Sequence, residues 1–348
     1  MRLNFPSMLM CPVNDSQRPM PDEKSESANA AEQLHVGHSI RERRLDKYLH
    51  GRFSNLSRSF IQNAIKQGAV KINGKIAKQS QKLSPGDIID FTPPEPPSKD
   101  ILPEDIPLNI IYEDEELIII NKQPDMIVHP ARGNTHGTLV NALAFYSDEL
   151  STGLGEFRPG IVHRLDKNTT GVMVVTKNDS AQWKIAKQFE HRQVNKTYLA
   201  IVHGTPELTS DRINVPLGIH PMFREKYAVR PESGKEAVTF YEVLESFRGF
   251  SLLKLTPKTG RTHQIRIHLS YIKHPIVADD MYGGKLIYPW QLADTEPAVT
   301  EPIINRVALH AFSLEFTHPA TNKMMKFEAP LPQDMQNLLD ELRKYRTI

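Results

Sequence analysis

Residues 158–171 read RPGIVHRLDKNTTG and run directly into the apolar segment 171–175. This loop places one carboxylate, Asp166, among two cations and a histidine, immediately before a predicted buried strand. One interpretation is a turn that Asp166 caps, with solvated cations beside it, because short motifs recur by chance. The other is that Asp166 is a nucleophile kept ionised by its neighbours, since a nearby cation lowers the pKa of a carboxyl group.

Apolar patterning around this loop predicts a mixed domain of strands and helices. Strands are predicted at 117–120, 171–175, 197–202 and 251–255, and helices at 181–190 and 335–343. The stretch 286–305 contains three prolines and no periodicity, so a long surface loop is expected there.

Two further segments carry candidate chemistry. KTYLA at 196–200 predicts a strand, and its Tyr198 is a catalytic candidate only if it faces Asp166, because most such aromatics simply pack. TGRTHQIRIHL at 259–269 fits a helix capped by Thr262, although the alternation of apolar residues would also fit a strand. We expect the helix, with Arg261 at its start and suited to meeting an anion. A plain surface helix with scattered polar residues is the alternative for this segment.

Positive charge is concentrated in one short part of the chain. The formal net charge is only +2, but residues 41–82 hold eleven Lys and Arg against two acids, a net charge of +9. Such asymmetry is typical of a module that binds phosphates. Within it the pattern predicts a helix at 58–67 capped by Ser57, a hairpin turn at Asn73-Gly74, and a second turn at 84–87 before a strand.

These boundaries divide the 348 residues into four parts. Residues 1–40 are polar and without periodicity, which predicts disorder. The basic domain spans 41–92, a proline-rich stiff linker 93–104, and the larger domain 105–348. A single cysteine, Cys11, excludes an intramolecular disulfide, and no apolar run is long enough for a membrane span or a secretory signal. We therefore expect a cytoplasmic protein that does not associate with membranes.

A metal site is the main competing interpretation of the histidine-rich segment. The candidates lie close in sequence: His263, His268, His274, Asp279 and Asp280. The first two histidines are five residues apart, which does not place them on one helical face, and no cysteine cluster or HExxH pattern supports a metal. Phosphate-binding glycine motifs of nucleotide cofactors are absent from the sequence. We expect neither a metal nor a cofactor.

Taken together, the ordered motifs resemble the RluA/RluD family of pseudouridine synthases. The segments 158–171, 196–200 and 259–269 look like the three signature motifs of that family, and the resemblance extends from about residue 105 to 332. Further similar stretches are IYEDEELIIINK at 111–122, HPIVADDMYG at 274–283 and ALHAFSLEFTHP at 308–319. The basic segment 43–91 is similar to an S4 RNA-binding domain. One departure is Gln123-Pro124-Asp125, where the family commonly has Pro-Ala-Gly after the lysine.

The resemblance implies an α+β fold, in which a central mixed, mainly antiparallel sheet with flanking helices follows a small α/β S4 domain. It implies isomerisation of uridine to pseudouridine with Asp166 as nucleophile or C2′ proton acceptor and Arg261 as its ion-pair partner. It also implies that Tyr198 stacks on the uracil and is the group near C5 for proton removal. The implied substrate contacts are His163, Arg164 and Arg266, with Arg164 filling the stack that the flipped base leaves. The implied RNA contacts of the basic domain are Arg44, Arg58, Lys71, Lys75 and Lys78.

Large-subunit ribosomal RNA is the substrate that this domain order favours, with transfer RNA as the alternative, and we expect a monomer. Two other functions stay open at this point. One is a non-catalytic RNA-binding factor in ribosome assembly, which would have no need of Asp166, Tyr198 and Arg261 together. The other is a metal-dependent hydrolase using His263 and Asp279, which chelators would inactivate.

Overall fold

The protein forms two compact units, Met1–Ser98 and Lys99–Ile348. The computed structural model describes residues 32–38, 44–53, 58–78, 80–92, 101–130, 135–147, 150–151, 159–223, 226–297 and 301–348. Most of the predicted N-terminal disordered segment and residues 93–100 of the predicted linker lie outside these residues. Among the described helices, none is long and apolar enough to cross a membrane.

The N-terminal unit is a small sheet that shares one core with two helices. Its four antiparallel strands have the order β1-β4-β2-β3. The elements are β1 (Glu32–His35), α1 (Leu45–Arg52), α2 (Arg58–Lys66), β2 (Val70–Ile72), β3 (Lys75–Ile76) and β4 (Ile88–Phe91). Apolar side chains of both helices pack on Val70, Ile89 and Phe91. This burial explains why so short and basic a segment folds.

The sequence predicted this unit apart from its first strand, β1, and its first helix, α1. The helix at 58–67 is confirmed as α2, and the hairpin is confirmed by Asn73 at φ 50° and Gly74 at φ 77°. Ser57, its predicted cap, lies outside the described residues. Disorder was wrong for Glu32–His35, because these residues pair with β4 as an edge strand held by backbone hydrogen bonds.

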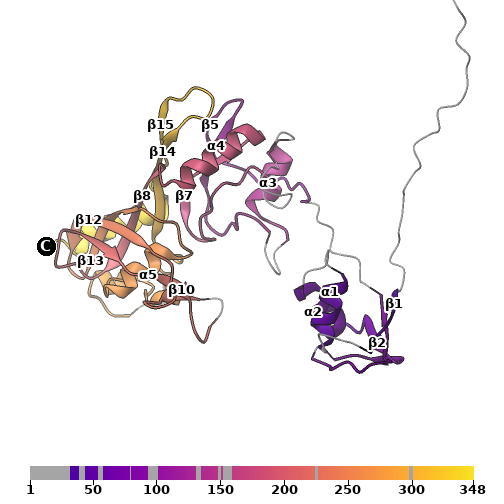
Figure 1. Ribbon diagram of the computed structural model, residues 1–348. Helices are drawn as coiled ribbons and strands as arrows, with labels where there is room; N and C mark the ends of the chain where they lie inside the picture. The colour runs from indigo at the N-terminus through magenta and orange to yellow at the C-terminus, as the bar shows by residue number, and fades with distance from the viewer. Residues whose placement is uncertain are drawn as a thin grey trace, which may run out of the picture. The chain divides into compact units, whose positions relative to one another are not determined.

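The second unit is built on one nine-stranded sheet (Figure 1). Its order is β5-β6-β7-β14-β8-β13-β12-β9, with β15 added beside β14. The strands are β5 (Ile110–Glu113), β6 (Leu117–Lys122), β7 (Thr170–Thr176), β8 (Asn195–His203), β9 (Ser210–Asn214), β12 (Val238–Phe247), β13 (Phe250–Pro257), β14 (Leu309–Thr317) and β15 (Met324–Glu328). Only the β7–β14 pair is parallel among the pairings in this sheet. The expected mixed, mainly antiparallel sheet is confirmed.

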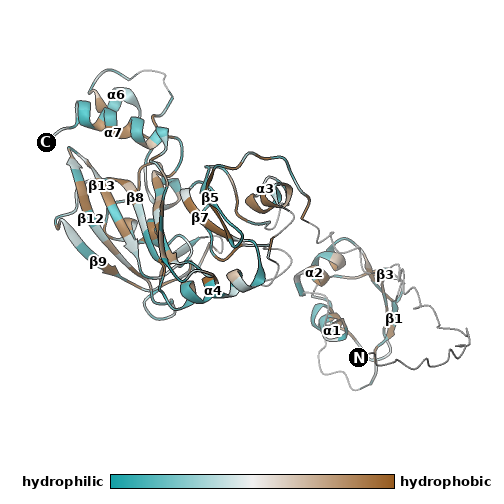
Figure 2. Ribbon diagram, turned by 90° about the horizontal axis from the view of Figure 1, so that it is seen from above, coloured by the Kyte–Doolittle hydropathy of each residue, from teal (hydrophilic) through white to brown (hydrophobic). Residues whose placement is uncertain are grey.

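Helices and a separate hairpin surround this sheet. They are α3 (Leu139–Tyr146), α4 (Asp179–Glu190), β10 (Leu217–Ile219), β11 (Tyr227–Val229), α5 (Gln264–Tyr271), η1 (Asp280–Tyr282), α6 (Pro289–Leu292) and α7 (Gln333–Tyr345). α7 is amphipathic, with polar and apolar residues alternating along it in Figure 2, and its leucines join the largest core. The predicted helices at 181–190 and 335–343 and all four predicted strands are confirmed.

The stretch 286–305 differs from the surface loop that its prolines predicted. The helix α6 lies inside it, and Ile287, Leu292 and Ile304 are buried in the core that α7 covers. Its prediction failed because the burial comes from contacts with a distant part of the chain, which local periodicity does not record.

The parallel pairing of β7 with β14 fixes where the 158–171 loop ends. Gly171 lies opposite Ala311 at φ 116°, and a Cβ atom at Gly171 would overlap the Ala311 carbonyl oxygen. Only glycine allows the two backbones to approach so closely at this conformation. The strand β7 can therefore begin directly after the loop that carries Asp166.

We predict that Gly171→Ala destabilises this unit by about 3 kcal/mol or more, because the added methyl group combines backbone strain with overlap in a packed sheet. Urea unfolding monitored by circular dichroism measures the change. Gly260→Ala is the matched control, since a Cβ atom there would meet nothing within 4 Å. Equal stability of the two variants would show that β7 and β14 do not need this close approach.

Candidate active site

The Asp166 loop is held at both ends by the sheet. Leu165 and Ile161 are buried in the core shared by α3, β6 and β7, and Thr176 donates its backbone N–H to the Gly160 carbonyl at 3.0 Å. A turn follows, in which the Thr169 N–H donates to the Asp166 carbonyl. With Leu165 anchored inward, the Asp166 side chain is left half-buried on the wall of a pocket.

A buried lysine ties this loop to the end of β6. Lys122 Nζ donates to the carbonyls of Gln123, Met126 and Lys167 at 2.7, 2.9 and 2.9 Å. Burial and repulsion from Arg306 lower the pKa of Lys122 to about 7, while the Asp166 carboxylate acts in the opposite direction. Its three carbonyl partners meet the hydrogen-bonding needs of an ammonium group that water does not reach. Through Lys122, the unusual Gln123-Pro124-Asp125 segment is thus held against the Asp166 loop.

Arg306 supports the same loop from the start of β14. Its Nη1 donates to the Asn168 carbonyl at 3.1 Å, and its other two nitrogens bind Asp334 at 2.6 and 2.7 Å. Neither Arg306 nor Lys122 was a candidate in the sequence, because both act through main-chain carbonyls that no residue pattern reveals.

The cation that reaches Asp166 is Arg266, and the predicted pairing with Arg261 was wrong. Arg266 Nη1 lies 3.3 Å from Asp166 Oδ2. Arg261 Nε instead donates to the Glu236 carbonyl at 3.1 Å, although Arg261 still lines the pocket.

The start of α5 explains this difference. The helix is confirmed, but its N-cap is His263 in the left-handed region at φ 54°, and not Thr262. Arg261 therefore lies in the preceding loop, whereas Arg266 lies in the first turn of the helix. Asp279 completes the arrangement, since its carboxylate accepts from Arg266 Nε and Nη2 at 2.8 and 2.7 Å. This bidentate pair fixes the guanidinium so that Nη1 is free to point at Asp166.

His263 and Tyr282 form a second link to Asp166. His263 Nε2 lies 3.8 Å from Asp166 Oδ2, and its Nδ1 is 2.9 Å from the Tyr282 hydroxyl. That hydroxyl also donates to the Tyr227 carbonyl, so it connects the β10–β11 hairpin to the site. Burial lowers the pKa of His263, and the nearby carboxylate of Asp166 raises it. Among the described residues no group of three or more acids, histidines and cysteines is arranged to hold a metal ion.

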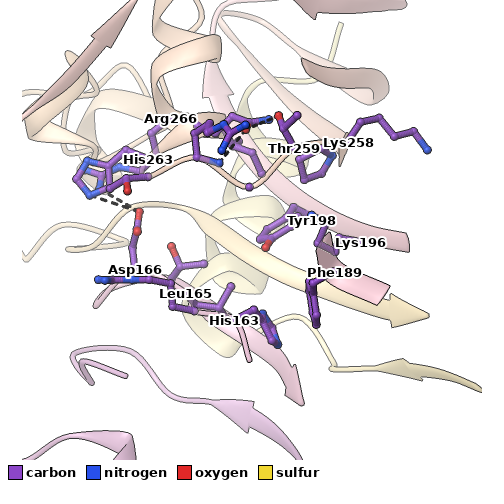
Figure 3. Close-up of a pocket in the computed structure, with 18 of the residues that line it drawn as sticks. His163, Leu165, Asp166, Phe189, Lys196, Tyr198, Lys258, Thr259, His263 and Arg266 are labelled. Atoms are coloured by element: carbon purple, nitrogen blue, oxygen red, sulfur yellow. Dashed lines mark hydrogen bonds and ion pairs between the residues drawn. The ribbon is translucent and has the colours of Figure 1, made fainter. Parts of the chain in front are cut away.

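Tyr198 lines the same pocket as Asp166, as the catalytic hypothesis required (Figure 3). It projects from β8 and packs between the two cores on that side of the sheet. Burial and the Asp166 carboxylate raise the pKa of Tyr198 well above that of a free phenol. At neutral pH this side chain is a neutral phenol with an apolar ring face.

His163 and Arg164 have different surroundings, although both line the pocket. The His163 ring stacks on Phe189 with 4.6 Å between centroids, and its Nε2 accepts from the Val174 N–H. Burial and repulsion from Lys196 lower the pKa of His163 to about 3, so it is neutral at physiological pH. Arg164 is exposed at the rim of the pocket.

The pocket itself has a volume of about 510 Å³, which is within the range of small-molecule sites. Figure 3 shows Asp166, His263 and Arg266 grouped on one side of it, with Tyr198, Lys196 and Phe189 on the other. An ionised carboxylate in contact with a fixed guanidinium, facing an aromatic ring, can act on the sugar of a nucleoside whose base lies on that ring.

Comparison with known proteins agrees with this geometry. The family model described as RNA pseudouridylate synthase matches residues 116–271, and the S4 domain model matches residues 43–89. A relative named as an RNA pseudouridine synthase of Bacillus subtilis (strain 168) is 41% identical over 301 residues, which cover 86% of this chain and 94% of the relative. The chain belongs to the RNA pseudouridine synthases.

Two further comparisons support this family. The ribosomal large subunit pseudouridine synthase D of Escherichia coli (strain K12) is 41% identical over 303 residues, 86% of this chain and 90% of that protein. The solved structure of human RNA pseudouridylate synthase domain containing 4 matches with a TM-score of 0.52 and 27% identity, covering 68% of this chain and 93% of that one. The α+β synthase fold is therefore confirmed.

We predict that Arg266→Lys slows pseudouridine formation by about 100-fold or more, because lysine cannot bind Asp279 through two nitrogens while also reaching Asp166. Arg261→Lys, the matched control, should change the rate by less than about threefold, since Arg261 is bonded to the Glu236 carbonyl. Release of tritium from RNA labelled at uridine C5 measures both rates. If Arg261→Lys lowered the rate as much as Arg266→Lys, Arg261 would have to be reconsidered as the partner of Asp166.

Proposed function

We propose that this chain isomerises uridine to pseudouridine in large-subunit ribosomal RNA, with Asp166 as the carboxylate that acts on the ribose. The observation that carries the proposal is Asp166 itself, half-buried in a pocket with Tyr198 and contacted by Arg266 at 3.3 Å. The choice of RNA is supported by relatives that are named ribosomal large subunit pseudouridine synthase D and match most of the chain.

The reaction breaks the bond between ribose C1′ and uracil N1 and joins C1′ to C5 of the same base. No atom is gained or lost except for the exchange of a proton, so the chemistry calls for neither a redox cofactor nor an energy source. Asp166 would either attack C1′, as carboxylates do in retaining glycosidases, or accept the C2′ proton. Both roles need an ionised carboxylate, and the guanidinium of Arg266 contacts that carboxylate at 3.3 Å.

Tyr198 is proposed as the surface on which the uracil lies. Its raised pKa disfavours a phenolate at neutral pH, so its ring offers stacking more readily than its oxygen offers a base for the C5 proton. A paired uridine cannot enter the pocket, so the base has to be flipped out of its stem. Arg164, exposed at the rim, is proposed to occupy the vacated position.

In the N-terminal unit, which the S4 domain model matches and which we call the S4 unit, three lysines are the best candidates for RNA contacts. Lys71, Lys75 and Lys78 are exposed. Arg44 and Arg58, two other predicted contacts, both donate to the carboxylate of buried Asp46. Burial alone would raise the pKa of Asp46, but hydrogen bonds from both arginines and from Gln62 outweigh it and hold the pKa well below the usual range. These two arginines therefore stabilise the fold of the unit as well as adding positive charge.

We predict that Asp166→Asn abolishes modification without preventing folding, because the amide cannot act as nucleophile or base. Pseudouridine mapping by carbodiimide-dependent reverse-transcription stops, on total RNA of a deletion strain complemented with each version, measures it. Wild-type protein should restore discrete sites in large-subunit RNA, and Asp166→Asn should restore none. Restoration by both versions would remove Asp166 from the chemistry, and loss of growth without loss of any pseudouridine would favour the non-catalytic assembly factor.

We predict that the triple change of Lys71, Lys75 and Lys78 to Ala weakens RNA binding and lowers the slope of log affinity against log salt by roughly 2–3, because about one counterion per lysine is no longer released. The rate of the chemical step at saturating RNA should stay nearly unchanged. A matched triple, Lys323, Lys326 and Lys344 to Ala, changes exposed lysines outside the S4 unit. Filter binding at several salt concentrations distinguishes them, and equal slopes would exclude the S4 lysines as phosphate contacts.

A further inference from the structure

The side of the pocket away from Asp166 carries two lysines, one on β8 and one directly after the end of β13. Lys196 and Tyr198 alternate along β8 and so project to the same face of the sheet. The β8–β13 register pairs Tyr198 with Leu255, and Lys258 follows directly after the end of β13, close enough to Lys196 for the two charges to repel each other. Both lysines line the pocket, where Figure 3 draws Lys196 next to Tyr198.

In the described part of the chain, no acid forms an ion pair with either lysine. The neighbouring Arg192, by contrast, is bound to Glu236 at 2.8 Å. Of the acids that line the pocket, Asp166 is bound to Arg266 on the other side, and Glu190 is exposed and forms no ion pair in the described part of the chain.

Partial burial makes this arrangement unfavourable for the protein alone. Lys196 is largely covered, while Lys258 is exposed at the rim. Burial, with repulsion from Lys258 and Arg192, lowers the pKa of Lys196 to about 8. A bound anion would relieve that repulsion, so the cluster fits a site that is completed by its ligand.

We propose that Lys196 and Lys258 bind a phosphodiester of the RNA strand whose uridine enters the pocket. The inference rests on the proposed function, because it takes an RNA strand as the ligand. A uridine is uncharged, so the only fixed anions that the substrate brings to the rim are its backbone phosphates. Lysines serve such groups as point charges, which suits two flexible side chains, one from β8 and one from just after β13.

Binding of a dinucleotide tests this subsite without any turnover. The ligands are uridylyl-uridine, which carries one phosphodiester, and its methylphosphonate analogue, which is neutral at the same position. The full-length wild-type chain should bind the charged ligand about tenfold or more tightly than the neutral one, as expected for lost charge-assisted hydrogen bonds. Titration followed by NMR measures both dissociation constants.

The double variant Lys196→Met/Lys258→Met should bind both ligands with the same, weaker affinity. Lys254→Met is the matched control, because Lys254 lies on β13 but is paired with Glu242, and it should keep the wild-type preference. Thermal unfolding checks that each variant folds. If the double variant does not fold, the single variant Lys258→Met, which changes an exposed residue, replaces it in the test.

Equal binding of the two ligands by the wild-type chain, or no binding of the charged one at millimolar concentration, overturns the subsite. Equal binding would instead indicate that the lysines face the uracil oxygens. Failure of the proposed function is seen separately, in the pseudouridine map. A charge-dependent preference that vanishes in the double variant supports the subsite, whatever that map shows.

Discussion

The site depends on one guanidinium shared between two carboxylates. Arg266 is almost fully buried and would be costly to place there without partners, but Asp279 binds two of its nitrogens and Asp166 a third. Because Asp279 is itself buried, the Arg266–Asp279 pair cannot rearrange without leaving a charge unpaired in the interior. The fixed guanidinium in turn limits the movement of Asp166, which is the least buried of the three side chains.

The loop that carries Asp166 is fixed from behind by groups that do not face the pocket. Lys122 and Arg306 bind the carbonyls of Lys167 and Asn168, the two central residues of the turn, and Gly171 allows the strand that follows to start at once. The Asp166 carboxylate in turn raises the pKa of Lys122, against the effects of burial and of Arg306. Mutations behind the loop should therefore affect catalysis through its position and charge, although neither residue lines the pocket.

The sequence predicted the strands β6, β7, β8 and β13, the helices α2, α4, α5 and α7 and the hairpin of the S4 unit, and it singled out the Asp166 loop, because each has a strong local signal. It assigned Arg261 as the partner of Asp166, but Arg261 lies in the loop before α5, and Arg266 in the first turn of the helix makes the contact. It missed the Tyr282–His263 contact and the role of Lys122, because these join segments far apart in the chain. The strand Glu32–His35 was not predicted, because it is held by backbone hydrogen bonds to β4, and a polar sequence can form these as well as an apolar one.

An isomerisation places a particular demand on such a pocket, because the detached base has to stay bound while it turns. The base cannot be held only by groups specific to one edge, since that edge changes between cleavage and rejoining. A flat ring such as Tyr198 tolerates rotation in its plane, whereas in the proposed reaction Asp166, with Arg266 beside it, acts on the ribose and does not follow the base. The ribose then needs anchors of its own, and lysines that bind its phosphodiester at the rim would keep C1′ in place until C5 arrives.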